Sequence, residues 1–278
     1  MNDWTLAWYD AVAESYDRLA VPYVFEQPAK DLVTILKLPR GARTLDAGAG
    51  TGVGALLASK SVGSEGLVVA LDTSLGMLLC ARKKGLPLLV IGGAPGLPFP
   101  DTVFDGVIAN FVLSHISSYQ AALSDMVRVL RPGGRLGITA WGSLQGEFRK
   151  LWQATAESFA SRDQLDRGLR QVLPWEGWLS DKGHLEDAMR DSGLEDIEVY
   201  HRVYESRVTV DDYLSMREIT FQAMIMKQLL GKDQWRSFQE EATKVFRSRS
   251  QGLIEDTRDA HLAIGIKPLQ IPRRKAPG

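Results

Sequence analysis

The sequence predicts an α/β protein built on a doubly wound, mostly parallel sheet. In the first half of the chain, short apolar runs of strand length alternate with segments of helical pattern. The run at 66–72, "GLVVALD", is continuously apolar, which is typical of a parallel strand covered by helices on both faces. Because parallel strands joined by helices form right-handed crossovers, the alternation favours an open, doubly wound sheet.

The elements of the first half can be placed from their apolar patterns and their caps. Ser74 suits the N-cap of a helix and Gly85 suits its C-terminal end. We expect strands at 44–48, 66–72, 87–93, 104–110 and 135–141, and helices at 25–38, 74–85 and 119–130.

The second half of the chain predicts mainly helices, inserted near the end of the sheet. A helical stripe covers 148–159, a cap at Thr209 introduces a helix over 213–230, and a third helix covers 233–247. One more helix-and-strand unit and a last strand at 260–268 complete the pattern. We therefore expect a core of 1–141, 181–204 and 258–268, helical insertions at 142–180 and 205–257, and a flexible tail at 269–278.

Composition and charge exclude several classes of partner. The 278 residues carry a net charge of -1, which gives no overall basic field to hold nucleic acid or an anionic membrane. Cys80 is the single cysteine, so an internal disulfide is impossible and a reducing compartment fits best. The acidic segment 1–17 does not resemble a signal peptide, and no 18-residue apolar window occurs. We expect a cytoplasmic protein with a small-molecule partner.

A glycine-rich segment follows the first predicted strand. "LDAGAGTGVGALLA" (45–58) does not fit the dinucleotide fingerprint, because the sixth position is Val53 counted from Gly48 and Ala55 counted from Gly50. Asp46, two residues before the loop, would repel a pyrophosphate and attract an ammonium group. The loop therefore predicts close backbone contact with a ligand that carries a cation, since a tight turn alone needs fewer glycines.

"LDAGAGTG" resembles the first motif of class I S-adenosylmethionine-dependent methyltransferases. "GGAPGLPFPDTVFDGVIANFVLSHI" (92–116) and "LRPGGRL" (130–136) are similar to segments of the ubiquinone and menaquinone C-methyltransferase-like group, and "AVAESYD" is similar to its leading helix. The resemblance implies a seven-stranded sheet of order 3-2-1-4-5-7-6 with the last strand antiparallel. It covers residues 9–141 well and fits 181–204 and 260–268 as the last two strands.

The resemblance also implies the cofactor, S-adenosyl-L-methionine, with S-adenosyl-L-homocysteine as the product. Asp72 matches the acid that accepts from both ribose hydroxyls, and Tyr16 matches a tyrosine that closes over the cofactor. Gly93 stands where the group usually has an acid for the adenine amino group, while the backbone N–H of Ala94 remains for the ring. The full set of cofactor residues that we expect is Tyr16, Asp46, Gly48, Ala49, Gly50, Asp72, Thr73, Met77, Gly93, Ala94, Asn110 and Phe111.

Methyl transfer needs a positioned nucleophile and the exclusion of water more than it needs a catalytic base. His115 follows the fourth strand, where the resemblance places the acceptor, and could take a proton near neutral pH. It could equally cap local backbone or pack under a lid. No cluster of histidines and carboxylates has ligand spacing, so we expect no metal.

The acceptor and the role of the insertions stay open in the sequence. The fourth strand lacks the Asn/Asp-Pro-Pro-Tyr signature of amino-methylating nucleic-acid enzymes, and the insertions are rich in aromatic residues and methionine, which suits a lid over an apolar or aromatic metabolite. The same residues could form a subdomain core or the face of a homodimer. Two alternatives stay open: a cofactor-binding relative that catalyses a rearrangement or cyclisation, and a binding module without catalysis. The glycine spacing disfavours a third, a nicotinamide-dependent oxidoreductase.

Overall fold

The computed structural model describes residues 3–269 and contains one seven-stranded sheet. Its strands are β1 (Arg43–Ala47), β2 (Leu67–Asp72), β3 (Leu89–Ile91), β4 (Phe104–Asn110), β5 (Leu130–Gln145), β6 (Glu195–Thr209) and β7 (Leu253–Ile266). The strand order is β3-β2-β1-β4-β5-β7-β6, and β7 runs antiparallel to both of its neighbours. The predicted fold class and strand order are confirmed. Residues 270–278, nearly all of the expected tail, lie outside the described residues.

Helices cover both faces of the sheet, as the apolar strands predict. On one face α2 (Glu26–Leu36), α3 (Val53–Val62) and α4 (Leu75–Lys83) share a core with the sheet. On the other face lie α5 (Tyr119–Val129), α8 (Glu176–Leu179) and α9 (Lys182–Asp191). The predicted cap of α4 is confirmed, because the Ser74 hydroxyl accepts from the backbone N–H of Met77 at 3.1 Å.

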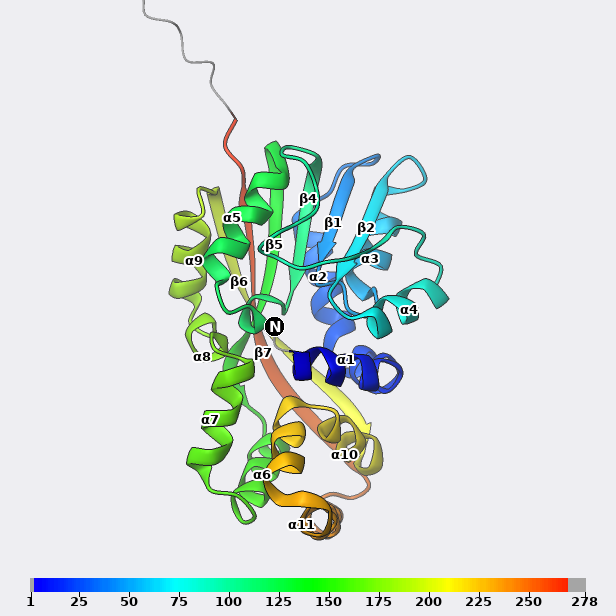
Figure 1. Ribbon diagram of the computed structural model, residues 1–278, viewed down its shortest axis with the longest axis vertical. Coiled ribbons are helices and arrows are strands. Elements are labelled where there is room, and N and C mark those ends of the chain that lie inside the picture. The colour runs from blue at the N-terminus through cyan, green and yellow to red at the C-terminus, as the bar shows by residue number, and fades with distance from the viewer. Residues whose placement is uncertain (1–2, 270–278) are drawn as a thin grey trace, which may run out of the picture.

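A second group of helices lies beyond one end of the strands (Figure 1). It contains α6 (Glu147–Glu157), α7 (Arg162–Val172), α10 (Val210–Glu218) and α11 (Phe221–Arg249), and we call it the helical part. Trp152, Tyr213, Phe238 and Phe246 are buried in its own core, which also includes residues of η1 (Tyr16–Phe25). The first helix, α1 (Asp3–Ser15), lies between the helical part and the sheet (Figure 1).

Two features of the second half differ from the sequence expectations. The helix expected over 213–230 is broken, because Thr220 caps α11 by accepting from Ala223 N, and α11 is itself kinked at Gly231, where φ is 68°. The last strands are longer than expected: β5, β6 and β7 continue past the sheet core, and β7 reaches into the helical part (Figure 1). Their extensions pair in register from Glu205↔Thr257 to Thr209↔Leu253, so ladder hydrogen bonds rather than apolar runs define them.

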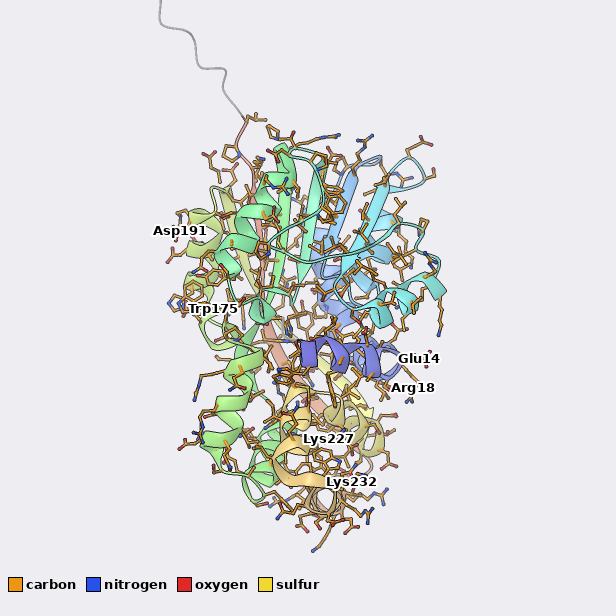
Figure 2. The ribbon with its side chains drawn as sticks, viewed as in Figure 1. Glu14, Arg18, Trp175, Asp191, Lys227 and Lys232 are labelled. Carbon is orange, nitrogen blue, oxygen red and sulfur yellow. The ribbon has the colours of Figure 1, made fainter. Side chains whose placement is uncertain are left out.

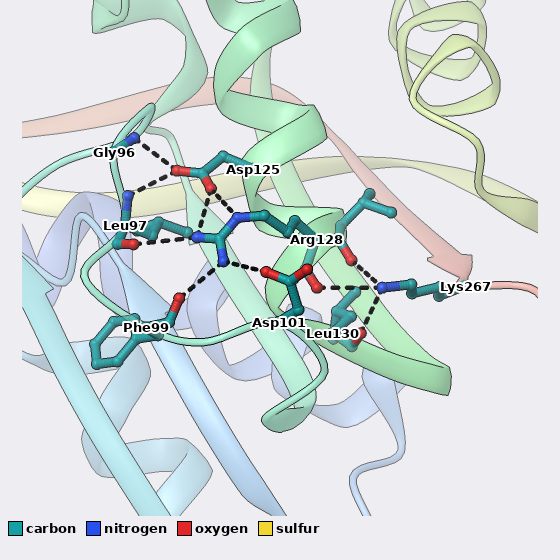
Figure 3. A network of polar contacts seen from close by, with 9 residues as sticks. Gly96, Leu97, Phe99, Asp101, Asp125, Arg128, Leu130 and Lys267 are labelled. Atoms are coloured by element: carbon teal, nitrogen blue, oxygen red, sulfur yellow. Dashed lines mark hydrogen bonds and ion pairs between the residues drawn. The ribbon is translucent and has the colours of Figure 1, made fainter.

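The loop between β3 and β4 is fixed to α5 by a polar network (Figure 3). The Asp125 carboxylate accepts from the backbone N–H groups of Gly96 and Leu97 at 2.6 and 2.7 Å. Arg128 donates to the carbonyl oxygens of Phe99 and Leu97 at 2.8 and 3.1 Å. These bonds satisfy backbone groups that no strand or helix serves, so the loop has a defined position. No helix within residues 3–269 is long and apolar enough to cross a membrane.

Candidate active site

A cavity of about 740 Å³ lies between the carboxyl ends of the parallel strands and the helical part. It is lined by the ends of β1, β2 and β4, by α1 and η1, and by residues of α6, α7, α8, α10 and α11. Open α/β sheets bind ligands at this edge, where neighbouring crossovers leave in opposite directions. The volume lies within the range of roughly 300 to 1,000 Å³ that is usual for small-molecule sites.

The glycine loop presents bare backbone to the cavity. Gly48 and Gly50 line it with φ values of 77° and 53°, a left-handed conformation that favours glycine. A Cβ on Gly50 would meet no atom within 4 Å, so the space beside it is open to a ligand. Gly52 and Gly54 serve packing instead: their Cβ atoms would approach Leu86 Cδ1 at 2.5 Å and Asp46 Oδ2 at 2.7 Å. A Cβ on Gly48 would likewise lie 2.5 Å from Val112 Cγ2, so of the four glycines only Gly50 leaves open space for a ligand.

Asp72 joins the glycine loop to the start of α4. Its Oδ2 accepts from Gly50 N and its Oδ1 from Ser74 N, both at 2.8 Å, and the side chain lines the cavity. Each carboxylate oxygen keeps a free lone pair for a further donor. Burial raises the pKa of Asp72, while the backbone N–H groups act in the opposite direction. The arrangement can accept from two vicinal hydroxyls of a ribose.

Asp46 has a different position from the one that its sequence motif suggests. It is buried and does not line the cavity, and its carboxylate lies against Gly54 at the start of α3. Burial raises the pKa of Asp46 to about 7. Any attraction for a ligand ammonium would therefore act through the loop rather than by direct contact. Ala49 is likewise buried in the core under the loop, whereas all the other expected cofactor residues line the cavity.

Thr73, Met77, Gly93 and Ala94 line the cavity around the end of β2 and the start of the β3–β4 loop. A Cβ on Gly93 would lie 2.9 Å from the Thr73 methyl group, so a side chain at this position would crowd Thr73. Gly93 and Ala94 begin the loop that Asp125 and Arg128 fix, so this part of the cavity wall has a defined position (Figure 3).

The N-terminal helix closes one wall of the cavity and is tied to α4. Asp10 Oδ1 accepts from the Ser74 hydroxyl at 2.5 Å and from Gly76 N at 2.8 Å. Tyr9 and Tyr16 line the cavity from α1 and η1, and burial raises the pKa of both phenols. The tie therefore positions two tyrosines that stay neutral at physiological pH.

His115 lines the cavity among aromatic side chains. Its ring centroid is 6.0 Å from that of Tyr9 and 5.6 Å from that of Phe221. Burial lowers the pKa of His115 to about 4, and its Nδ1 has no hydrogen-bond partner in the described structure. At neutral pH the imidazole is therefore uncharged, and its lowered pKa makes it a weaker base than a free histidine. Beside it, Phe111 lines the cavity with a φ of 56°, a rare conformation for a bulky residue and one that clusters at functional sites.

Several cavity residues were not predicted from the sequence. Tyr9 lies seven residues before Tyr16, a helical spacing that could have indicated it. Arg217, buried between apolar positions of α10, is the kind of charged residue in an apolar pattern that signals function. Glu176, Arg149 and Arg258 carry no sequence signal, because only the fold brings α8, α6 and β7 together. Within residues 3–269, no group of three or more histidines, cysteines or carboxylates is arranged to hold a metal ion.

Comparison with known proteins identifies the segment that holds the glycine loop. The family model described as a methyltransferase domain matches residues 45–138, which hold the glycine loop, Asp72 and His115. The chain contains a methyltransferase domain. With its strand order and glycine loop, the domain is of the class I type, whose cofactor is S-adenosylmethionine. The predicted family resemblance and cofactor are confirmed.

The relatives of this methyltransferase domain align with only part of the chain. Demethylmenaquinone methyltransferases from Staphylococcus epidermidis and Symbiobacterium thermophilum are 37% and 35% identical over 133 and 137 residues. These alignments cover 45% and 46% of this chain and 55% of each relative, so the chain spans about half the length of the relatives it matches.

Solved structures extend the likeness in fold to most of the chain. The YcgJ protein from Bacillus subtilis has a TM-score of 0.55 at 19% identity, covering 87% of this chain and 99% of that one. Phosphoethanolamine N-methyltransferase 2 from Haemonchus contortus, solved with S-adenosylhomocysteine, has a TM-score of 0.51 at 20% identity, covering 87% of this chain and 52% of that one. At these identities the likeness concerns the fold.

Proposed function

We propose that this protein transfers a methyl group from S-adenosylmethionine to a small metabolite bound between the sheet and the helical part. The observation that carries the proposal is one continuous cavity, lined at one end by the glycine loop and Asp72 and at the other by the helical insertions. Cofactor and acceptor residues thus share one enclosed space, as an in-line transfer requires.

The cavity residues fit the cofactor. Asp72 offers acceptors to the ribose, Gly50 leaves open space beside the loop, and Gly93 and Ala94 line the adenine end. When bound, S-adenosylmethionine supplies a methyl group on a sulfonium, which an acceptor nucleophile displaces. The chain's own part is then to hold the acceptor in line and to exclude water, which together supply most of the acceleration in such reactions.

His115 is the residue placed to handle a proton. Its uncharged imidazole, with a free Nδ1, lies among Tyr9 and Phe221 rather than in bulk solvent. A proton from an acceptor hydroxyl or amine can pass to the imidazole as the bond from the sulfonium to the methyl carbon breaks and the new bond to that carbon forms. We propose a base role for His115 on this ground.

We further propose that residues 142–180 and 205–257 form the acceptor subdomain. The relatives named for demethylmenaquinone point to a small-molecule acceptor, but the matched family segment, 45–138, ends before the helical part begins. Among the expected lid aromatics, Phe221 lines the cavity, whereas Trp152, Phe159 and Trp235 pack in the core of the helical part and Trp175 and Trp178 pack against the sheet domain.

Mass spectrometry of a metabolite library, incubated with the protein and S-adenosylmethionine carrying a deuterated methyl group, tests the proposal. We expect a product heavier by one labelled methyl group, together with S-adenosylhomocysteine. The Asp72→Asn variant is the matched control and should form much less of both products when the cofactor is kept below saturation. A converted metabolite without the label, or no S-adenosylhomocysteine beyond the control, would contradict methyl transfer and favour a rearrangement or a binding module.

A further inference from the structure

Three arginines line the cavity at the end away from the glycine loop. They are Arg149 on α6, Arg217 on α10 and Arg258 on β7, and Glu176 on α8 lines the cavity with them. The four residues come from four separate elements, so the helical part and the long strand β7 together create this charged end.

Two of the three guanidinium groups lack an anionic partner. Arg258 pairs with Asp256 at 2.6 Å. In the described structure Arg149 makes no hydrogen bond and no ion pair, and neither does the Glu176 side chain. Burial, together with the positive charges of Arg258 and Arg217, lowers the pKa of Arg149 to about 10, so it stays charged at neutral pH. Burial raises the pKa of Glu176, while the charges of the three arginines act in the opposite direction. With Glu176 ionised, three positive charges face two negative ones, those of Glu176 and Asp256.

Arg217 is held by two side-chain contacts, but part of its hydrogen-bonding capacity is unused. It is 7% exposed, its Nη2 donates to Gln222 Oε1 at 3.0 Å, and its guanidinium lies over the Trp152 ring at 5.3 Å. Gln222 Oε1 also accepts from Trp152 Nε1 at 3.0 Å, while the Arg217 Nε has no partner in the described structure. An uncompensated buried charge costs several kcal/mol. A fold keeps such a group mainly where a ligand completes it.

We propose that the methyl acceptor is an organic acid whose carboxylate is held by Arg149 and Arg217. A carboxylate supplies two oxygens in the plane that a guanidinium fork recognises, and its single charge equals the excess positive charge of the cluster. This inference rests on the proposed methyl transfer, because it names the substrate class of the same site.

The cavity provides a path from this charged end to the reacting atoms. Phe221 and Gln222 are neighbours on α11: Phe221 contacts His115, and Gln222 contacts Arg217. Leu169, Leu173 and Ile219 line the cavity along with them. An acid bound here has its apolar or aromatic body along Phe221 and its methyl-accepting atom toward His115, so the carboxylate is an anchor and not the methylated group.

Calorimetry on the full chain saturated with S-adenosylhomocysteine tests the inference without requiring turnover. The probes are benzoate, cinnamate and octanoate, with the corresponding amides as neutral isosteres and phenyl phosphate as the other anion. We expect at least one acid to bind at least about tenfold tighter than its amide. Arg149→Met should remove that difference, while Arg207→Met, which alters an exposed arginine outside the cavity, should not.

A stability measurement separates an anchor from a structural arginine. Because Arg149 has no partner, Arg149→Met should raise the melting temperature of the protein without an acid, whereas loss of a structural ion pair would lower it. Equal binding of acids and amides, no binding of any acid, or unchanged acid binding in Arg149→Met would overturn the proposal. If phenyl phosphate bound more tightly than the acids, the anionic group of the acceptor would be a phosphate and not a carboxylate. If Arg149→Met lost affinity for S-adenosylhomocysteine, Arg149 would bind the carboxylate of the cofactor and not that of the acceptor. Absence of methyl transfer with acid binding intact would count against the proposed function alone.

Discussion

Asp72 holds the glycine loop in position through its hydrogen bonds. Its two oxygens already accept from Gly50 N and Ser74 N, so a ribose adds to an existing network. Asp72→Asn removes the charge and one acceptor and should weaken S-adenosylhomocysteine by about ten- to 150-fold, the loss of about 1.5 to 3 kcal/mol expected for hydrogen bonds to a charged group. Calorimetry measures the affinity, and Asp187→Asn, at an exposed ion pair with Arg190 outside the cavity, is the matched control. An unchanged affinity in a folded Asp72 variant would remove this assignment.

His115 should make stability depend on pH in a definite direction. Its pKa of about 4 in the folded protein lies below the value of about 6.5 in an unfolded chain, so the unfolded state binds the extra proton between these pH values. The free energy of unfolding should therefore fall as the pH drops from 6.5 to 4, by up to about 3 kcal/mol from this group. Urea unfolding of the wild type and of His115→Gln at several pH values checks this, because the glutamine variant should lose that part of the slope.

Asp46 acts in the opposite direction over nearby pH values. Its raised pKa of about 7 means that the folded state holds a proton more tightly than the unfolded chain, so its contribution to stability is lost as the pH rises toward 7. The two effects oppose each other in the wild type. For that reason the difference between wild type and His115→Gln, rather than the wild-type profile, carries the test. A difference that does not change with pH would mean that His115 titrates normally.

The connection between α1 and α4 fixes the helix that forms one wall of the cavity. Asp10 bonds the Ser74 hydroxyl and Gly76 N, whereas the neighbouring pair Glu14–Lys83 is exposed, with Glu14 at the margin of the molecule (Figure 2). Asp10→Ala should loosen α1, speed the dissociation of S-adenosylhomocysteine and increase amide hydrogen exchange in α1. Glu14→Ala should change neither, because an exposed pair contributes little. Stopped-flow dissociation and hydrogen exchange measure both, and equal behaviour of the two variants would show that Asp10 does not hold the helix.

The elements of the sheet could be predicted and their extensions could not. Strands such as β2 and β4 are buried on both faces, so they appear as apolar runs, and the predicted 104–110 coincides with Phe104–Asn110. The outer half of β6 alternates polar and apolar residues and depends on pairing with β7, a partner distant in sequence. The glycine loop and Asp72 could be predicted as cofactor residues because they belong to a local sequence motif. Arg149 and Glu176 were missed, because their neighbours come from separate elements and no spacing along the chain records that proximity.

At the scale of the whole molecule, a conserved type of sheet and a helical part with its own core enclose one cavity. The core of the helical part holds Trp152, Phe238 and Phe246, and Lys232 is exposed on its surface (Figure 2). This arrangement makes stability and acceptor choice separable. Residues in the core of the helical part should affect unfolding, and only those that reach the cavity should affect turnover.

Phe221 and Met224, which lie one turn apart on α11, can test whether stability and acceptor choice depend on different residues. Both are buried, at 8% and 4% exposure, and both pack in the same small cluster with Trp8, but only Phe221 lines the cavity. Substitutions that roughly conserve volume, Phe221→Leu and Met224→Leu, should each cost less than about 1.5 kcal/mol of stability. Phe221→Leu should change turnover or acceptor choice, because its ring contacts Tyr9 and His115, while both variants keep S-adenosylhomocysteine affinity within a few-fold. Turnover, affinity, melting temperature and mass by light scattering are measured on both proteins. Equal turnover in the two variants, with a shift in melting temperature or in mass, would mean that this face of α11 is a packing or dimer surface and that the helical part does not select the acceptor.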